Sequence, residues 1–129
     1  MAKILVVDDD VDIRALVENR LRRLGHRVVS AGSGEEALTV LAEKGAPDVV
    51  VLDVLMPGIS GLELLTTIRQ DPDLADVPAV FLSGRVLETD IEAGRALGAT
   101  YLTKPVVLSA LATTIDKVLE LEAVGTGTW

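Results

Sequence analysis

Apolar residues gather in short unbroken runs, and between these runs they recur every three or four positions. The runs are rich in β-branched side chains and lack polar alternation, which is typical of strands buried on both faces of a sheet. The intervening segments have the period of amphipathic helices. Strands are predicted at 3–7, 27–31, 49–53, 79–82 and 101–103. Strands and helices therefore alternate along the chain.

The first two predicted helices have clear boundary signals. The first stops at Gly25, a residue type that commonly ends helices. Its apolar face is predicted from residues at three- and four-residue spacings: Ile13, Leu16, Val17, Leu21 and Leu24. In the second helix, Ser33 and Glu36 have the spacing of a capping box, in which each side chain binds the other residue's backbone N–H.

The later helices differ in strength. One begins near Gly61 and stops at the proline-containing segment 71–73. The helix predicted at 88–98 is the weakest, because its apolar face is thin and Gly94 costs about 1 kcal/mol relative to alanine. We therefore expect conformational change to be expressed in segment 84–98. The last helix has a long apolar face: Leu108, Leu111, Ile115, Val118 and Leu119.

Strict alternation of strand and helix predicts an α/β fold in which a parallel sheet is covered on both faces. For five strands the usual doubly wound, flavodoxin-like order is 2-1-3-4-5. The strand at 27–31 is the more polar one and is predicted to lie at an edge. We expect one domain over residues 1–122, followed by a flexible tail at 123–129.

Composition narrows the function. The chain has 129 residues, 49% of them hydrophobic, which suffices for one domain with an aliphatic core. It contains no cysteine, which excludes disulfides and thiol chemistry and favours a cytoplasmic setting. No signal peptide or membrane span is predicted, and a net charge of -8 argues against direct nucleic-acid binding. The isolated His26 is interpreted as a surface residue.

An early cluster of arginines is interpreted as a solvated helix face rather than a polyanion site: Arg14, Arg20, Arg22, Arg23 and Arg27. Candidate chemistry lies instead at the ends of the predicted strands. Ligands of doubly wound sheets bind beyond the carboxyl ends of the strands. The segment 8–10, which is Asp-Asp-Asp, follows the first strand, and Asp53 ends the third. Ser83 and Lys104 follow the fourth and fifth strands.

These side chains suggest phosphoryl chemistry. Clustered carboxylates repel one another unless a cation neutralises them, and oxygen ligands without histidine or cysteine indicate Mg²⁺ or Mn²⁺. A lysine and a hydroxyl can bind the oxygens of a transferring phosphoryl group. A carboxylate nucleophile in this setting, Asp53, suggests an aspartyl phosphate.

Four ordered motifs carry a resemblance to a known family. They are ILVVDDD at 4–10, VVLDVLMPGISG at 50–61, FLSG at 81–84 and YLTKP at 101–105. Over nearly its full length the chain resembles the receiver domain of two-component response regulators. The resemblance implies a phosphorelay signalling domain rather than an enzyme.

The resemblance also implies a role for each matched residue. Asp53 would accept a phosphoryl group from a sensor histidine kinase or a phosphotransfer protein, and Lys104 would pair with the phosphate. Ser83 would move toward the phosphoryl group, Tyr101 would turn inward, and the bond before Pro105 would be cis. Mg²⁺ would be held by Asp8, Asp9, Asp53 and the backbone carbonyl of Leu55.

Phosphorylation would switch an interaction surface on the fourth helix, fifth strand and fifth helix, read by a downstream protein or a tethered output domain. The segments 98–100 and 106–108 lack the acids common in such domains, so a salt-bridged dimer is in doubt and a monomer or weak dimer is expected. Leu55 and Arg85 occupy positions that would hinder the hydrolytic water, so slow self-dephosphorylation is predicted.

Two alternatives remain open. The segment 8–11 also fits the Asp-x-Asp nucleophile motif of haloacid dehalogenase-type phosphohydrolases. Against this, the chain is short for that fold, no acidic pair follows the fourth strand, and Asp53 would lack a role. The other alternative is a receiver-like module that binds partners without phosphorylation, which would be expected to lose the acids, the serine or the lysine.

Overall fold

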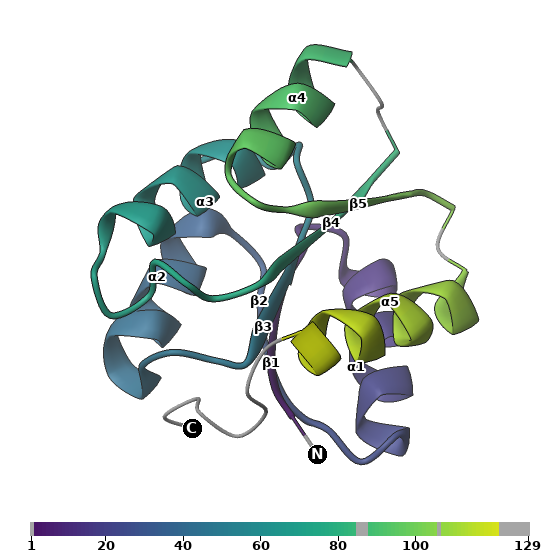
Figure 1. Ribbon diagram of the computed structural model, residues 1–129. Coiled ribbons are helices and arrows are strands. Elements are labelled where there is room, and N and C mark those ends of the chain that lie inside the picture. The colour runs from purple at the N-terminus through teal and green to yellow at the C-terminus, as the bar shows by residue number, and fades with distance from the viewer. Residues whose placement is uncertain (1, 85–87, 106, 122–129) are drawn as a thin grey trace.

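A computed structural model describes residues 2–84, 88–105 and 107–121 (Figure 1). Strands and helices alternate in the order β1 (Lys3–Val7), α1 (Val11–Arg23), β2 (Arg27–Ala31), α2 (Gly34–Lys44), β3 (Val49–Leu52), α3 (Gly61–Gln70), β4 (Ala79–Ser83), α4 (Glu88–Ala96), β5 (Thr100–Thr103) and α5 (Leu108–Leu121). The tail predicted at 123–129 lies outside the described residues, as does Arg85.

All strand pairs are parallel, and the sheet order is β2-β1-β3-β4-β5. The predicted doubly wound fold is therefore confirmed, with β2 at one edge as expected. Helices α1 and α5 cover one face of the sheet, and α2, α3 and α4 cover the other (Figure 1). None of the helices within the described residues has the length and apolar character needed to cross a membrane.

Each face of the sheet carries its own apolar core. From β1, Ile4 and Val6 point to the core beneath α1 and α5, whereas Leu5 and Val7 point to the core beneath α2 and α3. Successive side chains of a strand point to opposite faces, so a strand buried on both sides must be apolar throughout. This explains why the strands appear in the sequence as unbroken apolar runs.

The buried stripe of α1 is narrower than predicted. Val17 and Leu21, one turn apart, are fully buried. Leu16 and Leu24 are 57% and 49% exposed, so their assignment to the buried face was wrong. The apolar spacing cannot distinguish the row that points at the sheet from the rows beside it, because neighbouring rows on a helix share that spacing.

Helix starts also differ in detail from the prediction. The Ser33 hydroxyl accepts the Glu36 backbone N–H at 3.1 Å, but the Glu36 carboxylate accepts the N–H of Gly32 instead of Ser33. Only half of the predicted capping box is therefore formed. A complete capping box begins α3, where Ser60 and Glu63 each accept the other's backbone N–H. Sequence reasoning located that helix start without identifying its cap.

Candidate functional site

Strand register brings two acids together at the carboxyl edge of the sheet. Val7 of β1 is the register partner of Leu52 of β3, so the residues that follow them, Asp8 and Asp53, lie on neighbouring strand ends. The Asp53 backbone N–H donates to the Val7 carbonyl at 3.0 Å, which continues the ladder one residue past the strand. The sheet therefore fixes the backbone of Asp8 and Asp53 side by side at this edge.

A third acid, Asp9, completes the cluster. One carboxylate oxygen from each of Asp8, Asp9 and Asp53 lies within 4.8 Å of the others. Asp8 and Asp53 are 3% and 8% exposed, whereas Asp9 is exposed. Three hard oxygen donors without a histidine or cysteine ligand suit Mg²⁺ or Mn²⁺, and the exposed side leaves room for the waters that Mg²⁺ retains.

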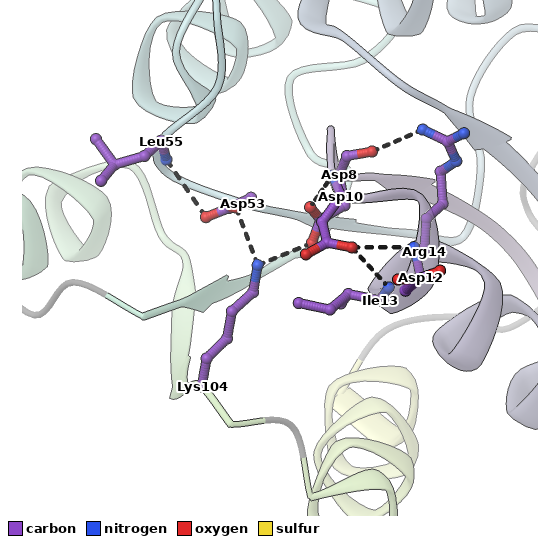
Figure 2. Close-up of polar contacts among 8 residues, drawn as sticks. All are labelled: Asp8, Asp10, Asp12, Ile13, Arg14, Asp53, Leu55 and Lys104. Carbon is purple, nitrogen blue, oxygen red and sulfur yellow. Dashed lines mark hydrogen bonds and ion pairs between the residues drawn. The ribbon is translucent and has the colours of Figure 1, made fainter.

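Lys104 provides the cation that faces these acids. Its Nζ lies 3.0 Å from Asp8 Oδ2 and 3.0 Å from Asp53 Oδ2, between the two carboxylates (Figure 2). Burial lowers the pKa of Lys104, but its hydrogen bonds to Asp53 and Asp8 and their negative charges outweigh burial, so the pKa lies above its ordinary value. Lys104 therefore remains protonated in this cluster.

The pKa of the Asp53 carboxyl group is also raised, which favours its neutral form. Burial raises the pKa of its carboxyl group, and the nearby charge of Asp8 raises it further. The hydrogen bond and charge of Lys104, and the N–H of Leu55 at 3.3 Å from Oδ1, only partly offset this. A partly desolvated carboxylate with a raised pKa is a more basic oxygen nucleophile than one in water, which suits it to attack a phosphorus centre.

The loop after β3 depends on a glycine that sequence reasoning treated only as a helix start. A Cβ at Gly61 would overlap the backbone carbonyl of Asp53, so no other residue fits without moving that carbonyl. The Gly61 N–H donates to the Val54 carbonyl at 2.8 Å. The first turn of α3 thus lies directly on the Asp53 peptide. The Leu55 side chain beside it is 48% exposed.

The strand ends of β4 and β5 carry the remaining candidates. Ser83, the last residue of β4, is 1% exposed, and its carbonyl accepts the Lys104 N–H at 2.8 Å. Tyr101 is half-buried, and its ring packs on Phe81 with centroids 5.0 Å apart. The peptide bond between Lys104 and Pro105 is cis.

The presence of Gly94 within α4 has a structural reason. A Cβ at this position would overlap the Tyr101 ring and lie 2.9 Å from its hydroxyl oxygen. The glycine that weakens the helix is therefore the surface on which Tyr101 rests. The sequence showed that Gly94 weakens the helix, but it did not show that Gly94 contacts Tyr101.

Asp10 and Arg14 support the cluster without joining it. Asp10 caps α1, because its Oδ1 accepts the N–H groups of Asp12 and Ile13. Arg14 Nη1 donates to the backbone carbonyl of Asp8 at 2.9 Å (Figure 2). Sequence reasoning counted Arg14 among the solvated arginines, and no local pattern marks this contact.

Comparison with known proteins identifies the family to which these motifs belong. A family model described as "Response regulator receiver domain" matches residues 4–116. Among solved structures, the chain is similar to the chemotaxis protein CheY4 of Vibrio cholerae, with 34% identity and a TM-score of 0.86 over 92% of this chain and 99% of that one. A putative response regulator from Chloroflexus aurantiacus is 35% identical with a TM-score of 0.85, over 92% of this chain and 98% of that one.

Curated relatives fall into two length classes. The transcriptional regulatory protein AfsQ1 of Streptomyces coelicolor is 42% identical over 82% of this chain, but this chain covers only 46% of it. Protein PilH of Pseudomonas aeruginosa is 36% identical over 92% of this chain, and 98% of PilH is covered. The chain thus spans less than half of AfsQ1 and nearly all of PilH.

Proposed function

Because the chain belongs to the response regulator receiver domain family, we propose that Asp53 accepts a phosphoryl group from a phosphohistidine of a sensor kinase or phosphotransfer protein. Members of this family are signalling domains rather than enzymes. In the proposed step an Asp53 oxygen attacks phosphorus, the P–N bond to the donor histidine breaks, and its electron pair stays on the imidazole nitrogen. The product is an aspartyl phosphate.

One observation carries this proposal: Lys104 Nζ lies 3.0 Å from both Asp8 and Asp53. A fixed ammonium at that place can pair with a phosphoryl oxygen on Asp53 without a large movement. Asp8, Asp9 and Asp53 would hold Mg²⁺, together with the Leu55 carbonyl. When bound, the metal neutralises the negative charge that builds up on the phosphoryl oxygens.

The response would pass through Ser83 and Tyr101. Ser83 is buried at the end of β4, beside the backbone of Lys104, so a shift of its side chain toward a phosphoryl oxygen would open space in the core. Tyr101 rests on Gly94 of α4 and on Phe81 of β4. Movement of its ring would therefore change the packing between β5 and α4. We assign the interaction surface to α4, β5 and α5.

The partners follow from this assignment. The donor is a histidine kinase or phosphotransfer protein, and the readout is a downstream protein or an output domain tethered to residues 1–122. We expect a monomer or weak dimer.

Leu55, 48% exposed beside Asp53, would obstruct the hydrolytic water, which supports the predicted slow self-dephosphorylation. A phosphoryl half-life of only seconds in Mg²⁺ buffer would contradict that prediction.

Treatment with acetyl phosphate and Mg²⁺ tests the proposal directly. Intact mass spectrometry should show the gain of one phosphoryl group, which disappears in Asp53→Asn and when Mg²⁺ is chelated. A stable label that persists in Asp53→Asn but is lost in Asp8→Asn would favour the phosphohydrolase alternative. If no mass is gained and beryllofluoride with Mg²⁺ does not bind, the domain acts without phosphorylation and the proposal fails.

A further inference from the structure

The turn that follows β2 contributes no ligand to the acidic cluster, yet it contacts Arg14, which binds the Asp8 backbone, and the loop that follows Asp53. This turn, residues 32–36, joins β2 to the start of α2 and is called here the β2–α2 turn. One of its sides faces the Asp8 loop through Arg14. Its other side faces the loop between β3 and α3, which begins at Asp53.

On the first side, Gly32 leaves space for an arginine. Arg14 Nη1 donates to the Asp8 carbonyl at 2.9 Å, and a Cβ at position 32 would lie 2.6 Å from the same Nη1. The guanidinium is therefore confined between the Asp8 carbonyl and the backbone of the β2–α2 turn. Any side chain at position 32 would displace it from Asp8.

On the second side, Glu35 holds the loop that follows Asp53. Its Oε1 accepts the backbone N–H of Ile59 at 3.0 Å, across 24 residues of chain. This hydrogen bond is the main reason that the pKa of the Glu35 carboxyl lies below its ordinary value. Gly34 of the turn also packs closely on Ile59, since a Cβ at position 34 would lie 2.9 Å from the Ile59 Cβ.

We propose that the β2–α2 turn positions the two acidic loops relative to each other, through Arg14 on the Asp8 side and Glu35 on the Asp53 side, and thereby sets divalent cation affinity. Both are positioning residues, because neither touches the carboxylates that would bind the metal. The inference rests on the proposed function and adds to it the means by which two loops from different strands keep one geometry. Partners outside the ligand shell commonly change metal affinity about 10-fold or more when removed.

A double-mutant cycle between Gly32 and Arg14 tests the first side. Gly32→Ala keeps every charge and displaces only the flexible end of Arg14, so the protein should still fold and lose only the hydrogen bond to the Asp8 carbonyl. Isothermal titration with MgCl₂ should show roughly 10-fold weaker binding. In an Arg14→Ala background, Gly32→Ala should have no further effect on Mg²⁺ affinity. An equal effect of Gly32→Ala in both backgrounds would overturn the role of Arg14.

Glu35 has a matched control on its own helix. Glu35→Ala should weaken Mg²⁺ binding several-fold, whereas Glu35→Gln, which keeps an acceptor for the Ile59 N–H, should retain most of the affinity. Glu43→Ala removes the same charge from an exposed position of α2 and should leave the affinity unchanged. If Glu35→Ala and Glu43→Ala behave alike, the effect is one of net charge and the positioning role is wrong.

The proposed function and the role of the β2–α2 turn would be contradicted by different results. If the unmodified protein neither binds Mg²⁺ nor accepts a phosphoryl group, the proposed function fails. If it does both and the Gly32 and Glu35 variants match it, only the β2–α2 turn loses its role. Urea unfolding in EDTA, run on every variant, separates loss of positioning from loss of fold, because a positioning defect weakens Mg²⁺ binding by a protein that still unfolds in one cooperative transition without metal.

Discussion

At the scale of single residues, burial of Asp53 in the acidic cluster makes the free energy of unfolding depend on pH. Asp53 is only 8% exposed, and burial raises the pKa of its carboxyl group. The native state therefore keeps a proton on Asp53 at pH values where the unfolded chain has lost it. The stabilisation from this group is complete below the unfolded-state pKa and is lost as the pH rises through the native pKa. Above its native pKa, the ionised Asp53 thus opposes folding.

Asp53→Asn is expected to raise the unfolding free energy at pH 7 in the absence of Mg²⁺. The amide removes the buried charge and its repulsion with Asp8, while Lys104 keeps its ion pair with Asp8. The advantage over the unmodified protein should shrink as the pH falls through the native pKa and vanish below the unfolded-state pKa of aspartate, where Asp53 is protonated in both states. Urea denaturation at several pH values measures this difference.

Asp73→Asn serves as the control, since Asp73 is exposed in the turn between α3 and β4. It changes net charge by the same amount without relieving a buried charge. Equal stabilisation by the two substitutions would mean that the overall charge of -8, and not burial of Asp53, governs the effect.

The residues predicted from the sequence are those that follow the apolar runs. Asp8, Asp53 and Lys104 directly follow strands, and parallel strands end at a common edge, so the strand pattern alone brings them near one another. Arg14 and Glu35 could not be predicted in this way. Their contacts are with backbone groups whose position depends on how loops distant in sequence approach each other.

At the scale of elements, α4 is the helix in which local propensity and tertiary packing conflict. Gly94 is unfavourable in a helix, but it is buried against Tyr101 of β5. Gly94→Ala should therefore destabilise the protein by about 1–3 kcal/mol, the usual cost of overpacking, although alanine is the better helix former. The Tyr101 ring should also leave its position on Phe81, which NMR chemical shifts of the two rings would detect.

Removal of the Tyr101 ring should turn the destabilisation caused by Gly94→Ala into a stabilisation. In a Tyr101→Ala background the space beside residue 94 is open, so Gly94→Ala should stabilise the protein by about 1 kcal/mol through helix propensity alone. The comparison of the two backgrounds in urea isolates the contact between α4 and β5. Destabilisation of similar size in both would show that the glycine serves some purpose other than Tyr101.

Arg69 at the end of α3 connects three segments. Its Nε donates to the Leu97 carbonyl at 2.8 Å, and its Nη1 donates to the carbonyls of Ala75 at 3.0 Å and Val77 at 2.6 Å. Arg69→Met leaves these carbonyls without their charged donor, and a loss of about 2 kcal/mol is expected. Hydrogen exchange at residues 94–98 should accelerate, because the Leu97 carbonyl, which follows α4, loses its hydrogen bond to Arg69 of α3.

Arg95→Met provides the comparison, because Arg95 is exposed on α4 and its loss removes the same charge. It should change stability by less than about 0.5 kcal/mol, as is usual for surface substitutions.

The element boundaries themselves followed well from the sequence. The connections made by Arg69, Gly94 and the Ser60–Glu63 cap did not, since each depends on tertiary distance or on a local hydrogen bond that spacing alone does not reveal.

At the scale of the whole molecule, the fold keeps its ionic chemistry at one edge of the sheet and its two apolar cores on the faces. The order β2-β1-β3-β4-β5 follows from strand and helix alternation, so the position of the site could be predicted before any distance was known. What could not be predicted is that Lys104 lies between Asp8 and Asp53, two of the three acids whose carboxylates could hold a metal ion. The lysine and a divalent cation therefore compete for the same negative charge.

This competition predicts how Mg²⁺ should change global stability. A ligand that binds only the native state stabilises it by about 2.7 kcal/mol at 100 times its dissociation constant. In Lys104→Met the metal no longer meets the repulsion of the ammonium, so Mg²⁺ affinity should rise by about tenfold, equivalent to about 1.4 kcal/mol. Without metal the variant should be less stable than the unmodified protein, because Asp8 and Asp53 lose their partner.

Urea unfolding over a series of MgCl₂ concentrations measures both effects at once. The two stability curves should converge as Mg²⁺ increases, since the added cation replaces the lost ammonium. Lys117→Met, which removes an exposed cation from α5, should shift the unmodified curve little at any Mg²⁺ concentration. Parallel curves for Lys104→Met and the unmodified protein would show that Lys104 and the metal act at separate places, contrary to the geometry of the cluster.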